Sequence, residues 1–278
     1  ALAATAVAGG RASILSFFAV AATAQLLTVA HLAGRVIGAL PAEVRAARAV
    51  RRDREWIRRS ANMALAAMAE AAHQYSDVVL IGHVLGASAA AGYFVVVRIA
   101  NIFSMLTSGI HNYSASKVSH LWYRERFDDL RRLMSQISVL TLAAVIALLV
   151  PIVFAGPFLL GIFGAEYRGL HTELVSMSAV TSLVALAGPG PLFLLFMGAD
   201  VLYLDLVLGA LVVRVAALLT LAPIFEMRGA IAAAGLATVP LAVTVATVCI
   251  RRFGVDPSVG SIVSTRLLAR RTGEVRRV

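Results

Sequence analysis

Charged side chains are scarce in this chain of 278 residues: they make up 14% of it, while 60% of the residues are apolar. Soluble domains average about 25% charged and 45–50% apolar residues. One ordinary core cannot hide such a surplus of apolar side chains. The composition therefore argues against a simple soluble domain and favours a protein embedded in lipid.

Cysteine is almost absent, and the common catalytic motifs are missing. The single cysteine, Cys249, excludes an intramolecular disulfide and a cysteine-built zinc site. The chain has no phosphate-binding glycine-rich loop ending in Lys-Ser or Lys-Thr, no HExxH and no GxSxG. We therefore expect no enzymatic activity, no catalytic residues, no cofactor and no metal site.

Long apolar segments are what the chain does have. A transmembrane helix needs about 20 mostly apolar residues. Seven complete spans are predicted, and residues 1–8 add the end of a partial one. The seven spans are residues 12–33, 60–85, 88–110, 134–154, 174–197, 202–222 and 229–250. The predicted fold is thus an all-α, polytopic transmembrane helix bundle.

Basic residues gather in three segments that the seven spans place on one side of the membrane. Residues 34–59, residues 111–133 and the tail from Arg251 together hold 20 of the 25 lysines and arginines. Basic loops remain in the cytoplasm. We therefore predict a multi-pass membrane protein with a cytoplasmic C-terminus. The alanine- and arginine-rich usage, with a single lysine, favours a bacterial source and hence the bacterial inner (plasma) membrane. The net charge of +10 then needs no nucleic-acid partner.

The second span carries a polar stripe. Glu70, His73, Gln74 and Asp77 follow i, i+3, i+4 and i+7 spacing, which places them on one helix face. A charge at the centre of a membrane helix costs roughly 2.5–3.5 kcal/mol, so such groups face a cavity or a partner. The stripe predicts either residues that couple transport to an ion or a structural contact that fixes the helix register.

Two arginines are predicted inside spans, Arg98 with Asn101 in the third and Arg214 in the sixth. Arg98 and Asp77 lie at similar depths on either side of a tight turn, which favours an Asp77–Arg98 pair. Arg214 has no evident partner. We predict that Arg98, Asn101 and Arg214 line a substrate cavity, because the planar guanidinium binds two oxygens of a phosphate at once.

The fifth span contains Gly188-Pro189-Gly190-Pro191. Proline removes a backbone hydrogen bond and clashes with the preceding helical turn. This sequence therefore predicts a broken helix, which acts either as a hinge beside a cavity or as a static kink.

Several short motifs occur in a fixed order between Ser76 and Ala230. They are Ser76-Asp77-Val78-Val79-Leu80-Ile81-Gly82, Leu85-Gly86, Ala91-Gly92-Tyr93, Arg98-Ile99, Phe163-Gly164-Ala165-Glu166-Tyr167, and Pro223 with Gly229-Ala230. Together they resemble the second lobe of polysaccharide flippases, which belong to the multidrug/oligosaccharidyl-lipid/polysaccharide exporter superfamily (MOP/MATE). In the "P-x-x-G-x-x-G-A" motif, Glu226 stands where the first glycine would be.

The resemblance implies a division of the chain into four parts. Residues 1–34 would be the truncated end of a first transmembrane lobe, and residues 35–59 a basic cytoplasmic linker. Residues 60–253 would form the second, six-helix, MATE-like lobe, and residues 254–278 a basic cytoplasmic tail.

The implied function is the flipping of an undecaprenyl-diphosphate-linked oligosaccharide by alternating access, for cell-surface polysaccharides such as exopolysaccharide or lipopolysaccharide. Its partners would be that lipid-linked oligosaccharide, membrane lipids and a polysaccharide polymerase or glycosyltransferases. Two alternatives stay open. One is a drug or cation antiporter of the same superfamily, and the other is a non-transporting assembly partner of polysaccharide synthesis.

Overall fold

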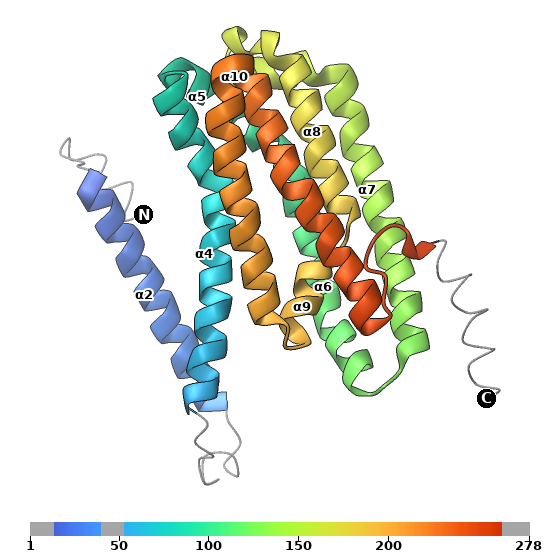
Figure 1. Ribbon diagram of the computed structural model, residues 1–278. Helices are drawn as coiled ribbons and strands as arrows, with labels where there is room; N and C mark the ends of the chain where they lie inside the picture. Colours follow the sequence, from blue (N-terminus) through green and yellow to red (C-terminus); the bar gives the residue numbers. More distant parts are fainter. Residues whose placement is uncertain (1–13, 40–52, 263–278) are drawn as a thin grey trace. The chain divides into compact units, whose positions relative to one another are not determined.

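A computed structural model describes residues 14–39 and 53–262 of the chain (Figure 1). The chain divides into two compact units between Asp53 and Arg54. The described part of the first unit is one helix, α2 (Ile14–Ala39), which contains most of the first predicted span. The predicted helix end at residues 1–8 and most of the predicted linker lie outside the described residues.

The second unit is a bundle of helices. Two predicted spans are interrupted: Asn101 separates α5 from α6 within the third, and residues 187–189 separate α8 from α9 within the fifth. The elements are α4 (Asp53–Val84), α5 (Ala87–Ala100), α6 (Ile102–Tyr123), α7 (Phe127–Gly161), η1 (Ala165–Leu170), α8 (His171–Leu186), α9 (Gly190–Phe196) and α10 (Asp200–Phe253).

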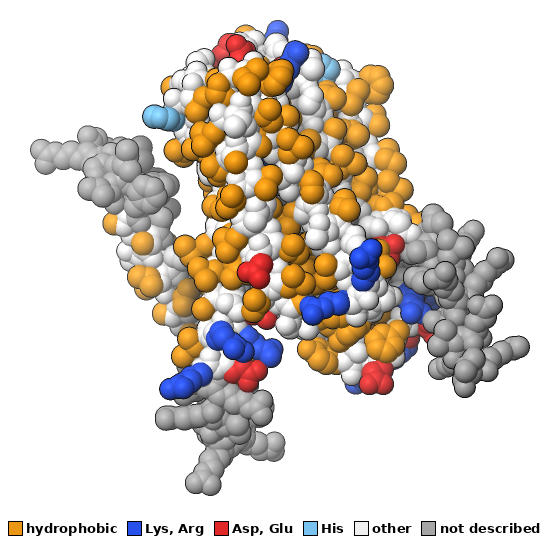
Figure 2. Space-filling view, viewed as in Figure 1, with side chains coloured by type: hydrophobic (Ala, Val, Ile, Leu, Met, Phe, Trp, Pro, Cys, Tyr) orange, Lys and Arg blue, Asp and Glu red, His pale blue; other side chains and the backbone are white. Residues whose placement is uncertain are grey.

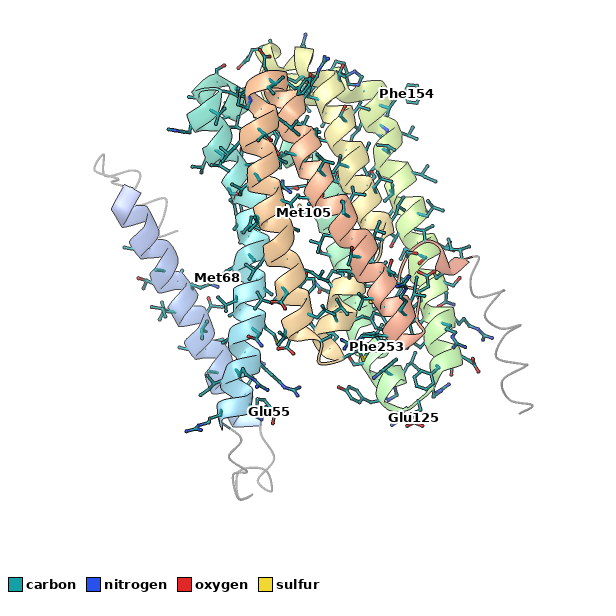
Figure 3. All side chains as sticks on the ribbon, in the orientation of Figure 1. Glu55, Met68, Met105, Glu125, Phe154 and Phe253 are labelled. Atoms are coloured by element: carbon teal, nitrogen blue, oxygen red, sulfur yellow. The ribbon has the colours of Figure 1, made fainter. Side chains whose placement is uncertain are left out.

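Four helical stretches among the described residues are long and apolar enough to cross a membrane. They are Ala87–Tyr123, Phe127–Gly161, Ala165–Leu186 and Asp200–Phe253. Apolar side chains cover the visible sides of the bundle (Figure 2), and Phe154 of α7 projects outward with 83% of its surface exposed (Figure 3). The all-α transmembrane bundle is therefore confirmed. That α2 and α4 also span the membrane stays a prediction.

The stretch named α10 consists of two helices that meet at Glu226, where φ is 53° and ψ is −134°. We call residues 200–225 the first arm and residues 227–253 the second arm; they run side by side in opposite directions (Figure 1). They contain the sixth and seventh predicted spans. Gly229 closes the turn, because a Cβ atom there would lie 2.2 Å from the carbonyl oxygen of Leu221.

Small residues let the second arm pack closely into the bundle. Ala230, Ala233, Ala234 and Ala237 follow i, i+3, i+4 and i+7 spacing, and each is at most 2% exposed. A Cβ atom on Gly235 would lie 3.2 Å from the Val180 side chain of α8. In lipid, van der Waals packing between such small-residue faces is a main cause of helix association.

The basic segments of the second unit lie at one end of the bundle. The start of α4, the α6–α7 connection and the end of α10 occupy the same end in Figure 1. This arrangement agrees with the topology predicted from the charges, although the cytoplasmic assignment of this end stays a prediction.

The first residues of the predicted basic tail pack against the bundle. Val255 is 2% exposed and Ser261 is also 2% exposed. The backbone N–H of Val259 donates to the carbonyl oxygen of Leu186 at 3.0 Å. The hydroxyl of Ser138 donates to the carbonyl oxygen of Ser258 at 3.0 Å. Residues 254–262 therefore fold back against α7 and the end of α8. Residues 263–278 lie outside the described part of the chain.

Candidate functional site

The polar stripe of α4 faces the first arm of α10, and the two helices are parallel. Four non-covalent links, three hydrogen bonds and one ion pair, join them in the same order along both helices. The pairs are Asn62 with Asp200 (2.9 Å), Glu70 with Tyr203, His73 with the carbonyl oxygen of Val207 (3.1 Å), and Asp77 with Arg214. Successive links lie on one face of α4, as the helical spacing requires. The stripe therefore fixes the register of α4 against α10.

The strongest of these links is a buried ion pair. Arg214 donates from Nε to Asp77 Oδ1 at 2.9 Å and to Oδ2 at 3.1 Å, and from Nη2 to Oδ2 at 2.5 Å. The hydroxyl of Tyr93 donates to the same Oδ2 at 2.6 Å. Asp77 is 1% exposed, Tyr93 1% and Arg214 6%. Several hydrogen bonds to one carboxylate in a membrane interior offset its desolvation.

The predicted Asp77–Arg98 pair is therefore wrong, as is the expectation that Arg214 lacks a partner. Asp77 and Arg98 lie at similar depths along their helices, but Arg98 is on a different face of α5 from the one that meets Asp77. Tyr93 faces Asp77, and Arg98 follows it by five residues, which turns its side chain about 140° away at 100° per residue. Arg98 is exposed, and it forms no ion pair or hydrogen bond with any other described residue.

Arg98 instead opens onto a cavity of about 600 Å³ between α4, α5, α6, α8 and the two arms of α10. The cavity brings together most of the residues predicted from the sequence; Asp77 is not part of its wall. The predicted residues in its lining are Glu70, His73, Gln74, Arg98, Asn101, Pro191 and Arg214. Met105 also lines it and lies at the centre of the view in Figure 3.

The groups facing this cavity differ in their charge and their bonding. Glu70 accepts a hydrogen bond from the Tyr203 hydroxyl and has no cationic partner within residues 14–39 and 53–262. His73 uses Nε2 for Val207, which leaves its buried Nδ1 without a hydrogen-bond partner. Gln74 is exposed and Asn101 half-buried. The wall thus offers a cation, a carboxylate and neutral donors and acceptors.

The predicted helix break is confirmed. α8 ends at Leu186 and α9 begins at Gly190. Gly188 has φ of +77°, and a Cβ atom there would lie 1.8 Å from the carbonyl oxygen of Pro257. The break lines a second cavity of about 380 Å³, which shares Glu70 and Pro191 with the first. Whether the break moves as a hinge stays a prediction.

Four residues of this site were not predicted as site residues. Tyr93 was identified only as part of the Ala91-Gly92-Tyr93 motif, and the sequence analysis did not predict a role for Tyr203, Asn62 or Asp200. One signal was available: counting back from Asp77 in helical steps of four, four, three and four residues reaches Asn62 on the same face. The described residues contain no group of three or more His, Cys, Asp or Glu side chains that could hold a metal ion.

Residues 63–171 match the family model described as MatE. This segment runs from α4 to the start of α8 and includes Asp77, Tyr93 and Arg98. The match supports the resemblance at the level of the superfamily, and with it a multi-pass membrane transporter. No curated protein and no solved structure matches the chain.

Proposed function

We propose that this protein flips an undecaprenyl-diphosphate-linked oligosaccharide across the bacterial inner membrane by alternating access, with Arg98 binding the diphosphate. One observation carries the proposal. Of the two arginines on the cavity wall, Arg214 is neutralised by Asp77, whereas Arg98 is exposed and has no partner among the described residues.

The charge of Arg98 is costly inside a membrane. An arginine within a membrane helix costs roughly 2.5–3.5 kcal/mol unless a partner or water offsets it. A diphosphate offers paired oxygens that fit the planar guanidinium, and a charge-assisted bond of this kind is about twice as strong as a neutral one. An anionic headgroup therefore suits the free end of Arg98.

The rest of the wall suits the hydroxyl groups of a sugar. His73 lines the cavity with its imidazole ring, whose Nδ1 is buried and has no hydrogen-bond partner among the described residues. Gln74, Asn101 and Thr181 add amide and hydroxyl groups that line the same cavity. Neutral groups that both donate and accept are what an uncharged oligosaccharide needs. The cavity thus combines one anion-binding group with several hydroxyl-binding groups.

A second function has its own supporting observation. Glu70 faces the same cavity, bound to Tyr203 and without a cationic partner among the described residues. A carboxylate in such a place suits a transported cation or a coupling ion, so the protein would be a drug or cation antiporter. In the flippase proposal the same Glu70 is the coupling carboxylate, and its protonation would alternate with the cavity opening.

The two functions make different demands on Arg98 and Glu70. The test is transport by the purified protein in liposomes, with a fluorescent undecaprenyl-diphosphate oligosaccharide in one assay and a fluorescent organic cation in the other. The flippase proposal expects movement of the lipid and loss of that movement in Arg98→Gln. The matched control is Arg132→Gln, an exposed arginine outside the cavity.

Movement of the organic cation alone, abolished by Glu70→Gln and unaffected by Arg98→Gln, would replace the flippase by the antiporter. Movement of neither substrate, together with co-purification of a polysaccharide polymerase or glycosyltransferase, would instead support the assembly-partner alternative.

A further inference from the structure

The basic end of the bundle has a groove away from the central cavity. This groove of about 420 Å³ separates the start of the first arm of α10 from the end of its second arm. Leu202 lines it from the first arm. Its other wall is the second arm, with Val243, Thr244, Thr247, Val248, Arg251 and Arg252.

The helical spacing explains why these residues share one wall. Val243, Thr247 and Arg251 follow each other at intervals of four residues, and so do Thr244, Val248 and Arg252. Residues four apart lie on one inclined ridge of a helix. Two neighbouring ridges therefore run down the groove, and each ends in an arginine.

The dimensions of the groove match one leaflet of a membrane. Residues 243 to 252 span about 14 Å at 1.5 Å per residue, while half of a hydrocarbon core is about 15 Å. The part of the second arm from Gly229 to Arg251 is about 33 Å long, close to the thickness of a hydrocarbon core. One end of the groove therefore lies near the bilayer midplane, and the arginines lie at headgroup level.

The charges at that level are available to a ligand. Arg251 and Arg252 are exposed, and neither forms an ion pair or hydrogen bond with another described residue. Thr244 is also exposed and its hydroxyl forms no hydrogen bond within the described part of the chain. The groove is thus cationic at its headgroup end, whereas Val243 and Thr244 line the end that lies near the midplane.

We infer that this groove binds an anionic phospholipid. One acyl chain lies along Leu202, Val243 and Val248, and the headgroup phosphate binds Arg251 and Arg252. The two arginines favour this occupant over a zwitterionic lipid, whose choline would offset the attraction. The inference does not depend on which substrate the central cavity carries.

The test is native mass spectrometry of the full chain, purified in a neutral detergent, with phosphatidylglycerol or phosphatidylcholine added. Wild type should retain phosphatidylglycerol in preference to phosphatidylcholine. The double variant Arg251→Gln/Arg252→Gln should bind phosphatidylglycerol about 30-fold more weakly, from about 1 kcal/mol for each arginine near an anionic headgroup. Thr244→Trp, which fills the groove without changing the charge, should also weaken binding.

The matched control is Arg124→Gln/Arg132→Gln. It removes two exposed arginines from the same end of the bundle that do not line the groove, and phosphatidylglycerol binding should change less than about twofold, that is, by less than about 0.4 kcal/mol. Equal losses in the two double variants would overturn the inference, because the attraction would then be unspecific. A dimer in wild type that becomes a monomer in Arg251→Gln/Arg252→Gln, with unchanged lipid binding, would assign the groove to a second copy of the chain.

Discussion

Replacing Asp77 by asparagine removes the negative charge from a carboxylate that binds Arg214 through both oxygens and also accepts a hydrogen bond from Tyr93. The variant keeps the shape of the side chain but leaves a guanidinium that is 6% exposed without its counter-charge. Breaking a buried pair in this way costs about 3–5 kcal/mol. For a chain of this length such a loss corresponds to a Tm about 10 °C lower.

The measurement is thermal unfolding of the purified protein in detergent, compared with a matched exposed pair. Arg228 donates to Glu173 at 3.0 Å, but its side chain is 73% exposed, so Glu173→Gln should cost less than about 1 kcal/mol. The double variant Asp77→Leu/Arg214→Met removes both charges and should recover most of the lost stability. An unchanged Tm in Asp77→Asn would refute the account of α4 and α10 as helices held together by this pair.

Two further predictions concern the backbone. Glu226 has φ of 53° and ψ of −134°, a conformation that suits glycine and costs other residues about 1–3 kcal/mol, so Glu226→Gly should raise the free energy of unfolding by about 1 kcal/mol; a lower Tm would contradict this. Gly188→Ala should cost more than about 2 kcal/mol, because its methyl group would lie 1.8 Å from the carbonyl oxygen of Pro257. Gly198, with φ of +76° and no atom within 4 Å of a built Cβ, is the control: Gly198→Ala should cost clearly less in the same unfolding assay, and equal costs would argue against the contact.

The parts of the structure that sequence alone could predict are those set by local periodicity and by the covalent chemistry of proline and glycine. Apolar runs predicted the helices, and the break at Gly188–Pro191 followed from residues that cannot continue a helix. The face shared by Glu70, His73 and Asp77 followed from 3.6 residues per turn. Each of these features depends only on neighbours within about ten residues along the chain.

The parts that failed depend on direction and on distant segments. Asp77 and Arg214 are 137 residues apart in the chain, and depth matching gave no information on which way Arg98 points around α5. Residues 254–262 fold back because the carbonyl group of Leu186, at the helix break, accepts a hydrogen bond from Val259. The polar and basic sequence of this segment gives no sign of that contact. Glu226 stands where the P-x-x-G-x-x-G-A motif has its first glycine. Its φ of 53° and ψ of −134° explain why a glycine suits that position.

The central claim is that Arg98 is the anion-binding group of the cavity, and the most direct measurement is the Kd for undecaprenyl diphosphate. Arg98→Gln should weaken binding about 10–100-fold, since a hydrogen bond to a charged group contributes about 1.5–3 kcal/mol. Arg98→Lys should lie between wild type and Arg98→Gln, because it keeps the charge and loses the planar fork. A Kd for Arg98→Gln within about twofold of both wild type and the Arg132→Gln control, a change of less than about 0.4 kcal/mol, would contradict the claim.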